Sequence, residues 1–104
     1  MKVLYVGIGK QPEVKEIDGS LKSMQDLVGG YIQAIPVSYD AELVCDEEGR
    51  MKGYPVNRCA FTIDGDVIDL ISGNFFIVGA GKDDFVSLTD EQISTYKEMY
   101  SSVR

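Results

Sequence analysis

The chain has 104 residues, 44% of them hydrophobic and 26% charged, which is the composition of one folded globular domain rather than a disordered segment. Its 17 acidic and 10 basic residues give a formal net charge of −7, so nucleic-acid binding is not expected, because such affinity rests on lysine and arginine contacts with phosphates. Histidine is absent, which excludes Ser-His-Asp and Cys-His catalysis and the usual zinc sites.

The first third of the chain predicts a β-hairpin followed by a short helix. Residues 3–6 are rich in branched and aromatic side chains, and residues 13–17 alternate polar with apolar, so the loop from Gly7 to Pro12 joins two expected strands. Ser20 is placed to cap a helix that Gly29-Gly30 ends. The apolar stripe expected on this helix consists of Leu21, Met24, Leu27 and Val28.

The middle of the chain predicts further strands. They are expected at residues 31–37, 41–45, 59–63, 67–71 and 74–78, with a short strand at 85–86. Pro36 lacks an amide hydrogen, so it places the first of these at an edge or a bulge of the sheet. Asp64-Gly65-Asp66 is a hairpin turn, whereas Met51 to Asn57 is expected to be an irregular surface segment. The run at 74–78 is the most hydrophobic and is expected to be the central strand.

The end of the chain predicts a second helix. Thr89 and Gln92 form a capping box, and Ile93, Tyr96, Met99 and Tyr100 lie at helical spacing. We therefore expect an α+β fold, organised as a single domain over residues 1–104. It has a mainly antiparallel sheet of about five to seven short strands and two helices, the second C-terminal. Both helices are expected on one face of the sheet.

Cysteine usage and hydropathy bear on localisation. Cys45 and Cys59 are most simply small buried side chains in a reducing compartment, with a disulfide or a redox role as the alternatives. The apolar run at residues 3–8 is too short for a signal peptide or a membrane span. The sequence therefore predicts a cytoplasmic protein without membrane association.

Two Gly-x-Gly-Lys segments follow predicted strands and are candidate anion-binding turns. Neither is a P-loop, since Gln11-Pro12 follow Lys10 and two aspartates follow Lys82. Tight turns explain the glycines. If the two turns meet at one end of the sheet, however, Lys10, Gly79, Gly81 and Lys82 would form an anion pocket without catalysis.

The segment 53–58 is the second candidate site. Tyr54, Asn57 and Arg58 supply a ring, an amide and a guanidinium, which are the groups that stack on and hydrogen-bond a planar or phosphorylated ligand. The alternative is structural, with Asn57 closing a turn and Arg58 pairing with an acid. The carboxylates match no EF-hand loop, so no metal site is expected. Because histidine is absent and no motif is complete, no cofactor and no catalytic residue is expected either.

Five blocks of the sequence carry a family resemblance: Val28 to Ile32, Cys45 to Gly49, Pro55 to Arg58, Gly73 to Gly79 and Leu88 to Gln92. Together they resemble domain-of-unknown-function family 3846, which comprises small proteins of bacteriophages, prophages and mobile elements. The resemblance implies expression in the cytoplasm of a bacterial host and supplies no activity, cofactor or site residue.

These observations lead to a functional hypothesis with two alternatives. The chain is predicted to be a non-catalytic phage or mobile-element accessory protein that binds and neutralises a host protein, such as a defence protein. The first alternative is a sponge-like binder of a phosphate-bearing small molecule, such as a signalling nucleotide. That ligand would be held by Lys10, Asn57, Arg58 and Lys82 at the subunit interface of a homo-oligomer. The second is an enzyme that uses a metal or carboxylates.

Overall fold

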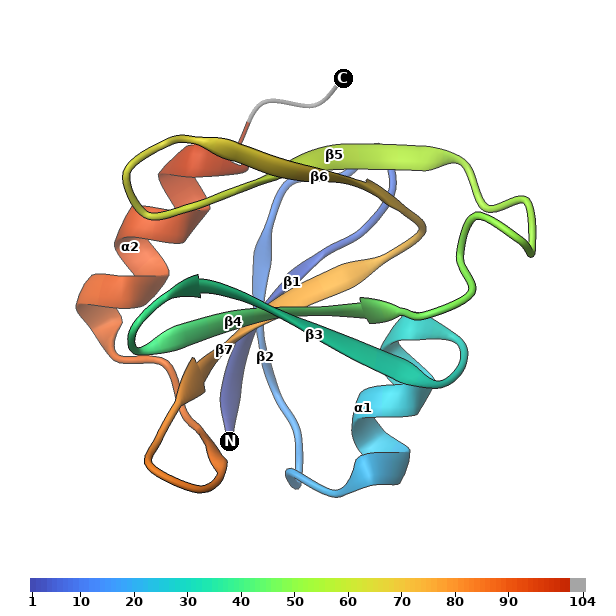
Figure 1. Ribbon diagram of the computed structural model, residues 1–104. Helices are drawn as coiled ribbons and strands as arrows, with labels where there is room; N and C mark the ends of the chain where they lie inside the picture. Colours follow the sequence, from blue (N-terminus) through green and yellow to red (C-terminus); the bar gives the residue numbers. More distant parts are fainter. Residues whose placement is uncertain (102–104) are drawn as a thin grey trace.

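The computed structural model describes residues 1–101 and has the expected α+β class. Most of its secondary structure is antiparallel strand, and two helices accompany the strands (Figure 1). The strands are β1 (Lys2–Val6), β2 (Glu13–Glu16), β3 (Ile32–Ser38), β4 (Ala41–Asp46), β5 (Val56–Phe61), β6 (Val67–Ser72), β7 (Phe75–Ala80) and β8 (Phe85–Val86). The helices are α1 (Leu21–Val28) and α2 (Asp90–Met99).

The main sheet has the strand order β2-β1-β7-β4-β3, and β8 pairs with the end of β7. The described pairs are antiparallel, so the prediction of a mainly antiparallel sheet is confirmed. β7 occupies the centre, as its hydrophobic run predicts. Pro36 lies in the edge strand β3, where the register shifts between Pro36 and Ser38, as its missing amide hydrogen also predicts.

The two helices cover opposite faces of this sheet. Alternate residues of β7 point to opposite sides, so Phe75 packs with Tyr96 of α2 and with Tyr100 at the C-cap of that helix, while Phe76 packs with Met24 and Val28 of α1. Figure 1 shows α1 and α2 on the two sides of the central strands. The expectation that both helices share one face is therefore wrong. A central strand with an unbroken apolar run must be covered on both faces.

Local capping signals fix where the helices begin and end. The Ser20 hydroxyl accepts from the Ser23 amide, and Gly29 ends α1 with a φ of 93°. The capping box of α2 is present, with both the Thr89 and the Gln92 side chains accepting backbone hydrogen bonds. One part of the predicted stripe on α1 is wrong, because Leu21 is 56% exposed at the first position of the helix.

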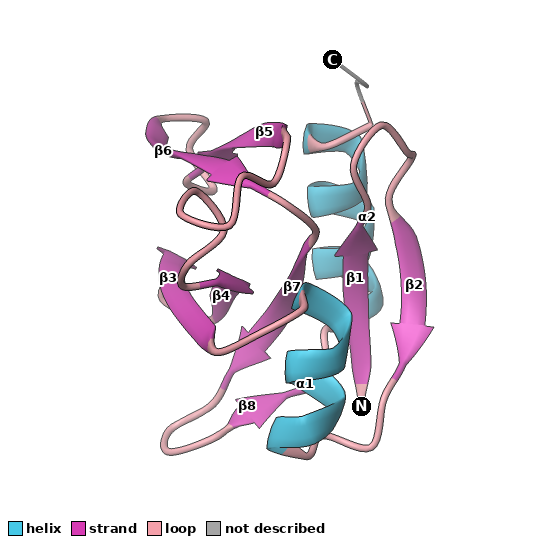
Figure 2. Cartoon of the chain, turned by 90° about the vertical axis from the view of Figure 1, so that its right-hand side faces the viewer, coloured by secondary structure: helices cyan, strands magenta, loops and turns pink. Residues whose placement is uncertain are grey.

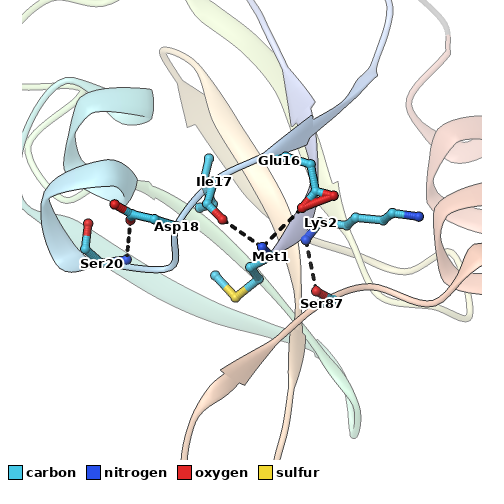
Figure 3. A network of polar contacts seen from close by, with 7 residues as sticks. All are labelled: Met1, Lys2, Glu16, Ile17, Asp18, Ser20 and Ser87. Carbon is cyan, nitrogen blue, oxygen red and sulfur yellow. Dashed lines mark hydrogen bonds and ion pairs between the residues drawn. The ribbon is translucent and has the colours of Figure 1, made fainter.

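The approach to α1 is held by polar contacts near the first strand (Figure 3). The Met1 amino group donates to the Ile17 carbonyl at 2.7 Å and to Glu16 Oε1 at 3.2 Å. In the residues that follow directly, the Ser20 amide donates to Asp18 Oδ1 at 2.8 Å, and hydrogen bonds from Ser20 lower the pKa of Asp18. These contacts hold the end of β2 against β1 and position the first turn of α1.

β5 and β6 form a separate two-stranded hairpin on the α2 side of the sheet. Ala60 and Ile71 from its inner face join the core that contains Tyr100. The Phe61 amide donates to the Tyr100 hydroxyl at 3.0 Å, and the Ile63 amide donates to the Val37 carbonyl at 2.9 Å. Figure 2 shows the hairpin beside the main sheet rather than within it.

Candidate functional site

Asn57, one of the predicted ligand-binding residues, is buried at the base of the β5–β6 hairpin. Its side chain is only 2% exposed. Its Nδ2 donates to the carbonyls of Val6 and Gly73, both at 2.9 Å. These bonds satisfy backbone groups of two other segments, so the amide holds the hairpin to the ends of β1 and β6.

Arg58 lies beside Asn57 and is 7% exposed. Its Nη1 donates to Asn57 Oδ1 at 2.6 Å and to the Gly7 carbonyl at 3.4 Å, and its Nη2 donates to the Lys10 carbonyl at 2.6 Å. Burial lowers the pKa of the guanidinium. These hydrogen bonds give Arg58 a structural role, because the planar guanidinium holds β5 against the loop that follows β1. Contact of Arg58 with a ligand stays a prediction.

Tyr54 is wedged between two glycines that have positive φ angles. A Cβ added to Gly73 would lie 2.7 Å from Tyr54 Cδ2, and one added to Gly29 would lie 3.0 Å from the hydroxyl. The Lys52 ammonium is 5.7 Å from the centre of the ring and 2.7 Å from Asp46 Oδ2. A side chain at Gly73 would overlap the Tyr54 ring, and one at Gly29 would press on its hydroxyl. The ring therefore anchors the segment between β4 and β5 to the end of α1.

The two Gly-x-Gly-Lys turns lie at opposite ends of the sheet. Val6, at the end of β1, pairs with Phe75, at the start of β7, so the turn that contains Lys10 lies there. Gly79 lies near the other end of β7, and Gly81 and Lys82 follow the end of that strand, about 17 Å from Phe75 at ~3.4 Å per residue. Because β1 and β7 are antiparallel, the joint anion pocket considered from the sequence does not form within one chain.

The turn that contains Lys82 is also acidic. It borders an open pocket of about 380 Å³, in which carboxylates outnumber the single ammonium group. An anion at Lys82 would therefore meet several negative charges. The residues around the pocket are Glu42, Gly81, Lys82, Asp83, Asp84 and Phe85.

A different feature dominates the surface of the hairpin. Residues 63–70, here called the hairpin arm, are eight consecutive exposed residues. Four of them are large and apolar: Ile63 is 43% exposed, Val67 62%, Ile68 42% and Leu70 42%. The apolar run predicts the strand, but the exposure of these side chains was not predicted. The aspartates at positions 64, 66 and 69 are the sequence signal that could have predicted this exposure, because aspartates are rarely buried and three of them lie within six residues.

Two pockets flank the hairpin arm. One has a volume of about 190 Å³ and lies between the arm and the end of β4, and the other has a volume of about 440 Å³ and lies between the tip and α2. In Figure 1 the tip of the hairpin lies next to α2. The first pocket includes Cys45, Arg50, Met51, Asp69 and Leu70, and the second is lined by Ile63, Asp64, Gly65, Thr95, Glu98 and Met99.

Side chains occupy part of the backbone edge of the arm. Arg50 Nη2 donates to the Leu70 carbonyl at 2.8 Å and pairs with Asp69 Oδ1 at 3.0 Å. The same Asp69 oxygen accepts from the Leu70 amide at 2.7 Å. Both backbone polar groups of Leu70 are thus satisfied, which blunts this edge against the addition of another strand.

The described residues assemble no metal centre, and both cysteines are free. Residues 1–101 contain no cluster of three or more cysteines, aspartates or glutamates with the geometry to hold a metal ion. Cys45 and Cys59 are free thiols. Burial, followed by the charges of Asp69 and Asp46, raises the pKa of Cys45 to about 11, so this thiol is protonated and unreactive at neutral pH.

The architecture defines a small α+β protein with a two-sided antiparallel sheet and a protruding hairpin. It belongs to the family described as Domain of unknown function (DUF3846), which matches residues 1–101. Comparison with curated proteins and with solved structures found no match. Neither helix within residues 1–101 has the length and apolar character needed to cross a membrane.

Proposed function

We propose that the chain is a non-catalytic phage or mobile-element accessory protein that binds and neutralises a host protein, and that the hairpin arm is its docking surface. The observation that supports this proposal is the run of four large apolar side chains exposed within eight consecutive residues. Contiguous exposed apolar surface costs free energy in water and is typical of protein–protein interfaces.

Other exposed apolar side chains do not form such a run. Leu21, Tyr31, Tyr39 and Val86 are each more than 40% exposed, but they belong to different elements or turns. Single exposed apolar residues are common on monomeric proteins. The arm differs because its apolar residues share one short hairpin, with a pocket on either side.

Binding of a phosphate-bearing ligand is the less favoured alternative. The guanidinium of Arg58 already donates to Asn57 and to the Lys10 carbonyl, and a phosphate would have to replace these short bonds. Lys82 lies at the far end of the sheet among carboxylates. A thermal-shift screen against linear and cyclic nucleotides tests this alternative, because a ligand at ~100 times its Kd adds about 2.7 kcal/mol of stability.

Quantitative capture of proteins from a bacterial lysate tests docking on the arm. The immobilised wild-type chain is compared with the double variant Val67→Ser/Leu70→Ser and with Tyr39→Ser, a control that removes an apolar side chain that is 96% exposed. We expect a protein that is retained by the wild type and the control but lost by the arm variant. Thermal melting verifies that all three chains are folded, since each surface change should alter stability by about 0.5 kcal/mol or less. Equal capture by the arm variant would overturn the proposal.

A further inference from the structure

The hairpin arm combines its apolar residues with negative charge. Asp64, Asp66 and Asp69 lie among the four apolar side chains, and the arm contains no lysine or arginine. Glu98 of α2 borders the pocket at the tip and adds a fourth carboxylate. Apart from Arg50, which pairs with Asp69, the charged groups around these apolar side chains are therefore negative.

Most of these carboxylates lack a basic partner. Within residues 1–101, the side chains of Asp64, Asp66 and Glu98 form no ion pair. Asp69 pairs with Arg50, but both side chains are well exposed, at 43% and 66%. Such an exposed pair contributes little to stability, so a partner's guanidinium can take the place of Arg50 at small cost.

The same charges argue against a second copy of the chain as the occupant. Two arms placed face to face would bring six aspartates together, on chains that each carry a formal charge of −7. Like charges at an interface cost free energy and suppress the wrong partner. A positively charged partner is attracted by the same carboxylates that repel a second copy of the chain.

We propose that the arm selects a protein segment in which lysine or arginine side chains alternate with large apolar ones. This inference rests on the proposed function and specifies its partner. The apolar side chains of the segment cover Val67, Ile68 and Leu70, while its cations lie beside Asp64, Asp66 and Glu98. Attraction between exposed charges accelerates the encounter and weakens as salt is added.

Two synthetic peptides of equal length and identical apolar residues test the inference. One carries lysine and arginine at its polar positions, and the other carries aspartate and glutamate. Each is titrated into the ¹⁵N-labelled full chain at low and at high salt, and amide shifts are followed by NMR. We expect the basic peptide to shift the resonances of residues 63–70 and 95–99, with affinity at least about 5-fold weaker at high salt, and the acidic peptide to shift none.

A matched pair of charge variants separates local recognition from the overall charge. Asp64→Asn/Asp66→Asn removes two charges from the arm, and Asp83→Asn/Asp84→Asn removes two from the exposed turn between β7 and β8. We expect the first variant to bind the basic peptide at least about 5-fold more weakly than wild type, and the second to bind it with nearly unchanged affinity.

The outcomes distinguish this inference from the function on which it rests. Equal weakening by both charge variants, equal binding of both peptides, or shifts that lie away from the arm would each overturn the inference. If Val67→Ser/Leu70→Ser abolishes lysate capture while the Asp64/Asp66 variant changes neither capture nor peptide affinity, charge selection fails and docking on the arm stands. If the Val67/Leu70 variant captures the same proteins as wild type, the docking proposal itself fails.

Discussion

Replacement of Arg58 by alanine should be among the most destabilising single changes in this chain. The side chain is 7% exposed and makes two hydrogen bonds of 2.6 Å, to Asn57 Oδ1 and to the Lys10 carbonyl. Hydrogen bonds to charged groups contribute about 1.5–3 kcal/mol each. Water can reach the Lys10 carbonyl in the variant but not Asn57, so we expect a net loss of about 3 kcal/mol.

That loss is large compared with the whole stability of a domain of this size. Small proteins are stable by about 5–15 kcal/mol in total, and each kcal/mol shifts Tm by roughly 4–8 °C in a domain of up to 100 residues. Thermal and urea unfolding followed by circular dichroism should therefore show Arg58→Ala melting about 12–24 °C below wild type.

Two further variants control for charge and for the fork geometry. Arg50→Ala also removes a guanidinium that pairs with a side chain and a carbonyl, but its side chain is 66% exposed, so we expect a loss of about 1 kcal/mol or less. Arg58→Lys keeps the charge but cannot reach both acceptors with one ammonium, and should fall between wild type and alanine. An Arg58→Ala chain that melts within about 4 °C of wild type would refute this reasoning.

Three other changes have defined outcomes. Gly73→Ala should lower the free energy of unfolding in urea by about 2 kcal/mol or more, because Gly73 has a φ of 94° and a Cβ there would contact Tyr54. Gly53→Ala also has a positive φ but open space around it, so it should lower that free energy by about 1 kcal/mol. Equal losses would contradict the contact with Tyr54. Cys45, with a pKa of about 11, should be alkylated at pH 8 far more slowly in the folded chain than in urea, as mass spectrometry can measure; equal rates would contradict its burial. Burial raises the pKa of Tyr100 above its ordinary value of 10.0, so the stability that its neutral hydroxyl contributes is present below pH 10 and lost as the pH rises through the raised pKa. The unfolding free energy should fall above pH 10, and Tyr100→Phe should reduce that fall; an unchanged slope would assign the effect to other groups.

The elements of the fold were largely predictable because their signals are local. Thr89 and Gln92 are three residues apart and satisfy each other's amides within one helical turn, so the capping box can be identified without knowledge of the rest of the chain. Pro36 likewise excludes a central strand by its own chemistry. Such signals fix where elements begin and end, but they do not say which faces meet.

The candidate sites were harder to predict because burial depends on distant partners. Asn57 and Arg58 are polar and lie in a segment that resembles a surface loop, yet their acceptors are the carbonyls of Val6, Gly7 and Lys10, about 50 positions earlier in the chain. The arm shows the converse. Its apolar residues are typical of a buried strand, and they are exposed because the hairpin lies beside the main sheet rather than within it.

The position of β7 between β1 and β4 has a consequence for synthesis on the ribosome. The β1–β2 and β3–β4 hairpins are local and can form early. They do not pair with each other, because β7 (residues 75–80) lies between them in the sheet and pairs with both β1 and β4. Until that strand leaves the exit tunnel, the edges of β1 and β4 that it pairs with in the finished sheet are open, a condition under which nascent chains aggregate or recruit chaperones. A chain that ends before residue 75 therefore holds the β1–β2, β3–β4 and β5–β6 hairpins without the strand that joins the first two into one sheet.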